Sequence, residues 1–157
     1  MTQFEEKGFQ KVEGFIPSFF STYLRNYFTL RVQNDPSLTG DPAVPNSHCV
    51  YGDPAFESVM IMAIADIEKI VGKKLIPQYT YARIYKNGSD LFKHSDRPEC
   101  EYSVSLCLGG EYEKTWPIWI KDYAGNSNEV PLEVGDMVVY HGTKLEHWRE
   151  KFEGNMQ

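Results

Sequence analysis

The chain has 157 residues and a mass of 18.1 kDa, enough to bury one hydrophobic core and too little for two ordinary domains. Its formal net charge of −6 disfavours tight nonspecific binding to nucleic acid, because such binding depends on a basic surface. The sequence contains no apolar run near the length that crosses a bilayer. We therefore expect residues 1–157 to form a single domain without a membrane span.

The N-terminal segment and the cysteines both favour a cytoplasmic protein. The segment carries the adjacent acidic residues Glu5 and Glu6 and lacks the basic and apolar regions of a secretory signal. The cysteines Cys49, Cys100 and Cys107 are odd in number and have no C-x-x-C spacing. This pattern argues against a disulfide framework and against a structural zinc site.

The first half of the chain predicts two helices separated by a loop. Residues 9–15 alternate weakly and predict a short strand, and residues 17–32 place apolar side chains at helical spacing. Residues 34–53 contain three prolines and two glycines among small polar residues, which is typical of a loop, here one that borders a site.

The second predicted helix has clear signals at both ends. Asp53 is a suitable N-cap, Pro54 suits the first helical position, and Gly72 provides a C-terminal stop. Between them, apolar residues form a broad face that should pack on a sheet.

After Gly72 the pattern changes to the period of two that is typical of strands. Short alternating runs separated by turns such as Asn-Gly and Gly-Gly predict an antiparallel sandwich or barrel. We therefore expect a mainly β (α+β) fold, a jelly roll supported by two N-terminal helices. The predicted strands lie in residues 78–85, 101–108, 116–120, 129–134 and 136–142.

Two polar residues near a strand end, His94 and Asp96, are spaced for a metal site. Residues i and i+2 of a strand point to the same face, so both side chains can approach one ion. An imidazole from a distant strand would complete two nitrogens and one oxygen on one face of an octahedral ion, leaving positions for substrate and dioxygen. His147 is the preferred donor because Arg149 at i+2 can project into the same cavity, and His141 is the competing donor.

The segments "ARIYKNGSDLFKHSD" and "GDMVVYHGTKLEHWREKFEG" resemble the prolyl-hydroxylase-like branch of the Fe(II)- and 2-oxoglutarate-dependent oxygenases. The resemblance covers about half of the chain, from Gln78 onward, and that family has a distorted jelly-roll fold. It implies that His94, Asp96 and His147 bind Fe(II) and that the hydroxyl of Tyr85 contacts 2-oxoglutarate.

One position departs from the family pattern. The family places a basic residue about ten positions beyond the distal histidine, where it pairs with the C5 carboxylate of 2-oxoglutarate, but Gln157 stands there and ends the sequence. A guanidinium matches a carboxylate bidentately, so Arg149 is favoured over Lys151 as the replacement cation. The abrupt end also predicts a truncated chain that lacks the closing strand.

The resemblance implies a dioxygenase that couples decarboxylation of 2-oxoglutarate to succinate with hydroxylation of an unactivated C–H bond. The expected substrate is a prolyl or other peptidyl residue or a small molecule, and ascorbate is the expected reductant. A cupin-like metal-binding protein without oxygenase turnover is the alternative, kept open by the missing distal basic residue. A nucleic-acid demethylase of the same superfamily is disfavoured by the net charge.

Overall fold

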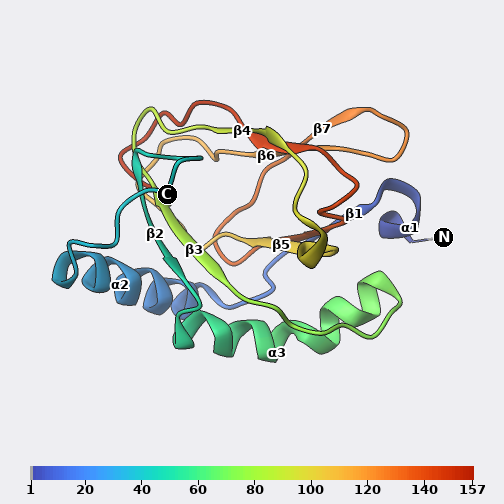
Figure 1. The fold of residues 1–157 in the computed structure, drawn as a ribbon, viewed down its shortest axis with the longest axis horizontal. Coiled ribbons are helices and arrows are strands. Elements are labelled where there is room, and N and C mark those ends of the chain that lie inside the picture. The colour runs from blue at the N-terminus through green and yellow to red at the C-terminus, as the bar shows by residue number, and fades with distance from the viewer. Residues whose placement is uncertain (1) are drawn as a thin grey trace.

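The computed structural model describes residues 2–157, which form two facing antiparallel sheets with two long helices outside one of them (Figure 1). The helices are α1 (Gln3–Lys7), α2 (Ser18–Asn34), α3 (Pro54–Val71) and the 3₁₀ turn η1 (Pro98–Cys100). The strands are β1 (Phe9–Val12), β2 (Ser47–Tyr51), β3 (Tyr81–Tyr85), β4 (Leu91–His94), β5 (Ser103–Leu106), β6 (Ile118–Lys121), β7 (Ser127–Val130), β8 (Met137–Tyr140) and β9 (His147–Arg149).

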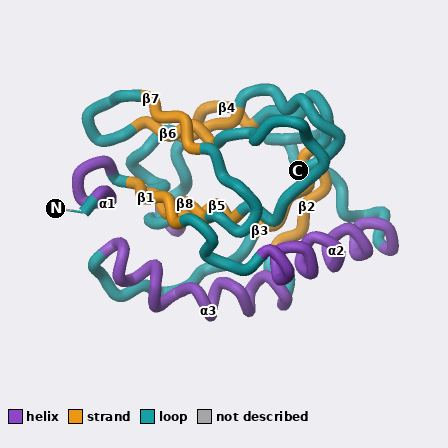
Figure 2. Tube along the Cα trace, turned by 180° about the vertical axis from the view of Figure 1, so that it is seen from behind, coloured by secondary structure: helices purple, strands orange, loops and turns teal. Residues whose placement is uncertain are grey.

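The strands are arranged in three hydrogen-bonded groups. One sheet has the order β1-β8-β5, the second has the order β4-β9-β6-β7, and β2 and β3 pair as a separate ribbon. Figure 2 shows α2 and α3 below the first sheet, and β4, β6 and β7 above it. The predicted jelly-roll class with two supporting helices is therefore confirmed.

The core lies on both faces of β8, the central strand of the first sheet. Met137 and Val139 pack with Ala63 and other apolar residues of α3, because alternate residues of a strand point to opposite faces. Val138 packs with Ile120 of the second sheet in a separate cluster. The helix layer and the second sheet are thus each fixed to the first sheet by apolar burial.

The predicted ends of the second long helix are confirmed. The side chain of Asp53 accepts a hydrogen bond from the backbone N–H of Ala55 at 2.9 Å, and Pro54 begins α3. Gly72 ends the helix in the left-handed conformation with a φ of 72°, which glycine adopts without steric cost. None of the helices in residues 2–157 is long and apolar enough to cross a membrane.

The prediction of a loop throughout residues 34–53 is wrong at its C-terminal end, where β2 forms. β2 pairs with β3 in a regular antiparallel register that places Ser47 opposite Tyr85 and Cys49 opposite Arg83. The three prolines of this segment lie before Ser47, so all five residues of β2 have a backbone N–H that can donate to the ladder. The short helix α1 was also missed, although Thr2 and Glu5 form a reciprocal capping box at its start.

The C-terminal residues lie between two segments that are distant in sequence. Met156 forms isolated antiparallel bridges with both Lys86 and Glu111. The backbone N–H of Gln157 donates to the carbonyl of Tyr85 at 3.0 Å. In residues 2–157 no regular strand follows β9, but these bridges hold the C-terminal end beside β3.

Candidate metal centre

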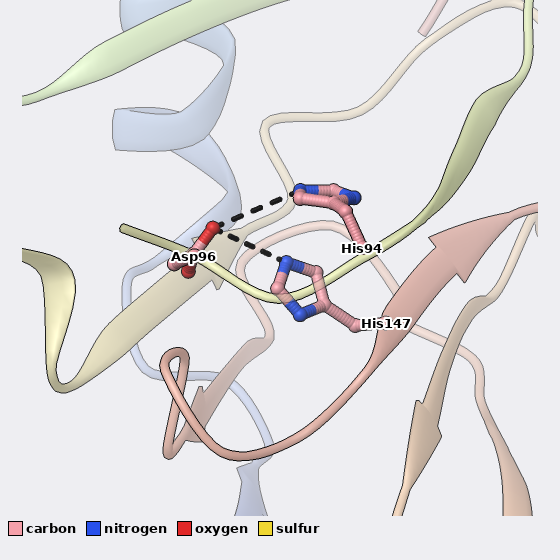
Figure 3. Close-up of side chains that lie close together, drawn as sticks. All are labelled: His94, Asp96 and His147. Atoms are coloured by element: carbon pink, nitrogen blue, oxygen red, sulfur yellow. Dashed lines mark ion pairs between the residues drawn. The ribbon is translucent and has the colours of Figure 1, made fainter. Parts of the chain in front are cut away.

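The three predicted metal ligands are brought together by the pairing of β4 with β9. His94 lies directly opposite His147 in this antiparallel pair, and their ring centroids are 4.4 Å apart. Asp96 follows His94 by two residues, and its backbone N–H donates to the carbonyl of Gly142 at 2.8 Å. Figure 3 shows the two imidazoles and the carboxylate turned toward one point.

The distances suit one ion bound by two nitrogens and one oxygen. The Oδ1 atom of Asp96 lies 3.7 Å from Nε2 of His94 and 3.5 Å from Nε2 of His147. One ligand atom from each residue lies within 4.8 Å of the others. Adjacent ligands of an octahedral ion with bonds of about 2.1 Å are about 3 Å apart, so a small inward movement of the side chains would suffice.

Hydrogen bonds to the backbone set which nitrogen of each histidine is free. Nδ1 of His94 lies 2.8 Å from the carbonyl oxygen of Phe92, and Nδ1 of His147 lies 3.0 Å from that of Leu145. A carbonyl can only accept, so each Nδ1 is the protonated nitrogen in the neutral ring. The lone pair on each Nε2 therefore faces Asp96 and can bind a metal.

The environment of Asp96 favours its ionised form. Burial opposes ionisation, but hydrogen bonds from His147, when its Nε2 carries a proton, and from the hydroxyl of Ser103 outweigh it, so the pKa of Asp96 lies below its ordinary value. The hydroxyl of Ser103 donates to Oδ2 at 2.6 Å, which leaves Oδ1 for an ion. Ser103 was not identified from the sequence, because its place in an alternating strand gave no separate signal.

His141, the competing ligand, lies outside this group. Its Nδ1 lies 2.8 Å from the hydroxyl of Tyr123, and its ring stacks on that of Tyr102 with centroids 4.9 Å apart. The side chain is buried there, and burial lowers the pKa of the imidazole below its ordinary value. His48 lies in β2, within the segment that was predicted to be a loop, and contacts the carbonyl of Leu38 through Nδ1 at 2.7 Å.

The residues predicted to contact 2-oxoglutarate, Tyr85 and Arg149, lie side by side. The guanidinium carbon of Arg149 is 5.8 Å from the centre of the Tyr85 ring and 4.8 Å from that of Trp116. Nη1 of Arg149 donates to the carbonyl of Trp116 at 3.0 Å, and the residue is only 9% exposed. Arg149 is thus an interior cation beside a tyrosine rather than a surface charge.

A cavity of about 720 Å³ lies between the first residues of β3 and the edge of β5. Apolar residues of α3, including Phe56 and Ile67, form one part of its wall. Asp96 and Tyr140 form another part, so the cavity reaches the candidate metal centre. A small molecule or an extended side chain could therefore approach the ion through it.

Comparisons with known proteins identify the fold. No family model matches the sequence, and no curated protein is significantly similar to it. A prolyl-4-hydroxylase from Pseudomonas putida superimposes with a TM-score of 0.79 at 15% identity, covering 98% of this chain and 89% of that one. HygX from Streptomyces hygroscopicus, solved with nickel and 2-oxoglutarate, gives a TM-score of 0.73 at 15% identity, covering 99% and 84%.

A third similar structure is a prolyl hydroxylase from Trichoplax adhaerens in complex with a peptide fragment of a hypoxia inducible factor. It gives a TM-score of 0.72 at 14% identity, covering 98% of this chain and 81% of that one. The chain therefore has the jelly-roll fold of the prolyl hydroxylases and related 2-oxoglutarate oxygenases, as the resemblance in sequence predicted.

Proposed function

We propose that this single-domain chain is an Fe(II)- and 2-oxoglutarate-dependent dioxygenase and that His94, Asp96 and His147 bind its iron. The observation that carries the proposal is the convergence of the two free Nε2 atoms on the Asp96 carboxylate, within a fold that solved 2-oxoglutarate oxygenases share. Two imidazoles, one ionised carboxylate and no thiolate are a donor set that suits Fe(II).

Each residue of the centre has a definite task in this proposal. Bound iron would supply the activation of dioxygen for attack on a C–H bond. His94, Asp96 and His147 would hold the ion through three of its coordination positions and would leave the others for further ligands. The carbonyl oxygens of Phe92 and Leu145 keep the two imidazoles in the tautomer that binds metal.

Arg149 and Tyr85 would bind the distal carboxylate of 2-oxoglutarate. In β9, Arg149 follows His147 by two residues, so both side chains lie on the same face about 7 Å apart along the strand. A guanidinium held at one nitrogen by the carbonyl of Trp116 still has donors for a carboxylate. Burial strengthens such a charge-assisted contact because the local dielectric is low.

The primary substrate in this proposal is a prolyl or other peptidyl residue or a small molecule. The Trichoplax structure contains a peptide, and a second structure of HygX contains hygromycin B, so the fold serves both classes in similar proteins. The cavity beside Asp96 has the volume that a small molecule or a side chain needs.

The test is succinate release from 2-oxoglutarate in the presence of Fe(II) and ascorbate. The wild-type protein should release succinate, the His147→Ala variant should not, and the matched His141→Ala variant should retain turnover. If iron-loaded wild-type protein neither binds 2-oxoglutarate nor forms succinate, the oxygenase proposal fails and the cupin-like alternative is favoured. If His141→Ala loses metal while His147→Ala keeps it, the ligand assignment is wrong.

A further inference from the structure

Arg83 is a second interior cation that the proposed chemistry does not use. It shares one face of β3 with Tyr81 and Tyr85, because alternate residues of a strand point the same way. Its guanidinium carbon lies 5.0 Å from the centre of the Tyr81 ring and 5.5 Å from that of Tyr85. The side chain is only 11% exposed, so the charge lies between two aromatic rings inside the protein.

Contacts at the two ends of β3 show where Arg83 lies relative to the candidate metal centre. Just before the strand, the hydroxyl of Tyr79 lies 3.1 Å from Sγ of Cys100, in the segment that follows Asp96. At the end of the strand, the ring of Tyr85 lies beside Arg149. The strand therefore runs from the neighbourhood of the metal ligand to the position of the deep cation.

Arg83 precedes Tyr85 by two residues, a distance of about 7 Å along a strand. On the opposite wall, His147 precedes Arg149 by the same spacing. Arg83 therefore lies between the end of β3 that is near Asp96 and the end that is beside Arg149. The cavity that reaches Asp96 is also lined by Tyr81, whose ring packs against the guanidinium of Arg83.

The guanidinium of Arg83 has donors to spare. Nη2 forms an ion pair with Asp41, and the same Oδ2 atom accepts from the hydroxyl of Tyr81 at 2.6 Å. Nε is buried, and no acceptor within residues 2–157 lies in hydrogen-bonding reach of it. Buried donors in proteins are usually hydrogen-bonded, so a structural ion pair with Asp41 does not by itself explain the unpaired Nε of Arg83.

We propose that Arg83 binds a carboxylate at the level of the metal, separate from the carboxylate position at Arg149. The inference rests on the proposed oxygenase function. Nε and Nη2 form the edge of a guanidinium that grips a carboxylate bidentately, and Asp41 occupies only Nη2. An incoming carboxylate would therefore displace Asp41 from this edge and gain the unmatched Nε.

Two compounds could supply this carboxylate, the primary substrate or 2-oxoglutarate itself. Arg149 already provides a deep cation for the distal carboxylate of the cosubstrate, and the other end of that molecule would lie at the ion. The primary substrate is therefore the source that the geometry favours, which makes it a carboxylic acid whose reactive carbon lies beside the anionic group.

The experiment measures binding to Mn(II)-loaded protein, which separates it from turnover. Calorimetry would first give the affinity for 2-oxoglutarate in the wild type and in Arg83→Gln and Arg149→Gln. With 2-oxoglutarate saturating, benzoate and its neutral counterpart benzamide would then be titrated as probes. We expect Arg83→Gln to keep the affinity for 2-oxoglutarate within threefold and to lose at least tenfold in affinity for benzoate, with benzamide unaffected.

The variant Asp41→Asn serves as the matched test, because it frees the guanidinium while Arg83 stays in place. It should bind benzoate at least threefold more tightly than the wild type does, whereas a merely structural ion pair predicts no gain. Thermal unfolding would show that each variant is folded, and Arg83→Lys replaces Arg83→Gln if the latter is not.

The outcomes discriminate between the sources. Loss of 2-oxoglutarate affinity in Arg83→Gln, without a preference for benzoate over benzamide in the wild type, would assign the position to the cosubstrate. Unchanged affinities for both carboxylates in a folded Arg83→Gln variant would overturn the inference. Failure of the wild type to bind 2-oxoglutarate would refute the oxygenase proposal, and titration of benzoate and benzamide without 2-oxoglutarate would then decide the role of Arg83.

Discussion

Replacing Asp96 by alanine should weaken metal binding strongly while leaving the apo fold nearly as stable. The carboxylate is one of three ligands, and loss of an outer-sphere partner alone costs about 10- to 100-fold in metal affinity. Loss of the ligand itself should therefore cost at least about 100-fold. In the apo protein, the side chain accepts one hydrogen bond, from Ser103, whose removal costs about 1 kcal/mol.

The effect can be expressed as a change in thermal stability. At a metal concentration 100 times the wild-type dissociation constant, binding stabilises the folded state by about 2.7 kcal/mol. A variant with 100-fold weaker affinity gains only about 0.4 kcal/mol at the same concentration. The difference of about 2.3 kcal/mol corresponds to about 5–9 °C for a domain of this size.

The assay is thermal unfolding with and without Mn(II), combined with a calorimetric titration of the metal. The wild type should show the larger metal-induced rise in melting temperature, and the two apo proteins should melt within a few degrees of each other. An equal rise in both proteins would remove Asp96 from the ligand set. A large loss of apo stability would instead show that the carboxylate mainly supports the fold.

Three further predictions concern stability and cosubstrate binding. Burial raises the pKa of Asp136, but Lys11 and backbone donors outweigh it, so the pKa lies below its ordinary value. This carboxylate therefore stabilises the fold above about pH 5 and loses that effect as the pH falls through its lowered pKa. In urea unfolding, the stability of Asp136→Asn should therefore depend less on pH in the acid range than the stability of the wild type does. An identical pH dependence of the two proteins would contradict this prediction. Asp53→Ala removes the N-cap of α3 and the ion pair with Arg31, so it should lower the free energy of unfolding by about 3 kcal/mol, measured by chemical denaturation. A loss below about 1 kcal/mol would mean that these contacts are weak. Tyr85→Phe should weaken 2-oxoglutarate binding to Mn(II)-loaded protein by roughly fivefold, because the loss of one hydrogen bond costs about 1 kcal/mol. An unchanged affinity in calorimetry would show that the hydroxyl does not contact the cosubstrate.

The parts of the fold that could be predicted are those that local patterns specify. The helix from Pro54 has a cap, a proline and a terminal glycine, each of which acts within a few residues. The spacing of His94 and Asp96 likewise predicted that the two side chains lie close together, although Asp96 lies two residues beyond the end of β4. β2 was missed because its stability comes from pairing with β3, a contact that no local pattern records.

In the candidate site too, local sequence patterns do not specify the features that depend on tertiary contacts. That His147 rather than His141 meets the other two residues depends on the register of β9 against β4, which is a tertiary property. Arg83 carried a usable signal, since it precedes Tyr85 by two residues in an alternating run and must share its face. Its partner Asp41 lies in the preceding loop, and nothing in the sequence indicates that the loop folds back onto β3.

The apolar character of β8 on both faces has a consequence for strand alignment. A strand with one exposed face cannot slip by one residue without exposing its apolar side chains, but all four residues of β8 are buried. Hydrophobicity alone therefore does not select the alignment here, and Asp136 provides a polar contact that favours the observed one. It anchors the start of β8 by accepting from the backbone N–H groups of Gly14 at 2.8 Å and Glu133 at 3.0 Å.

At the other end of β8, the ring of Tyr140 lies 4.7 Å from that of His147. A misaligned β8 would turn Tyr140 to the helix side and withdraw the wall against which this imidazole rests. Asp136, at the opposite end of β8 from Tyr140, thus helps to keep the candidate metal ligand His147 in position.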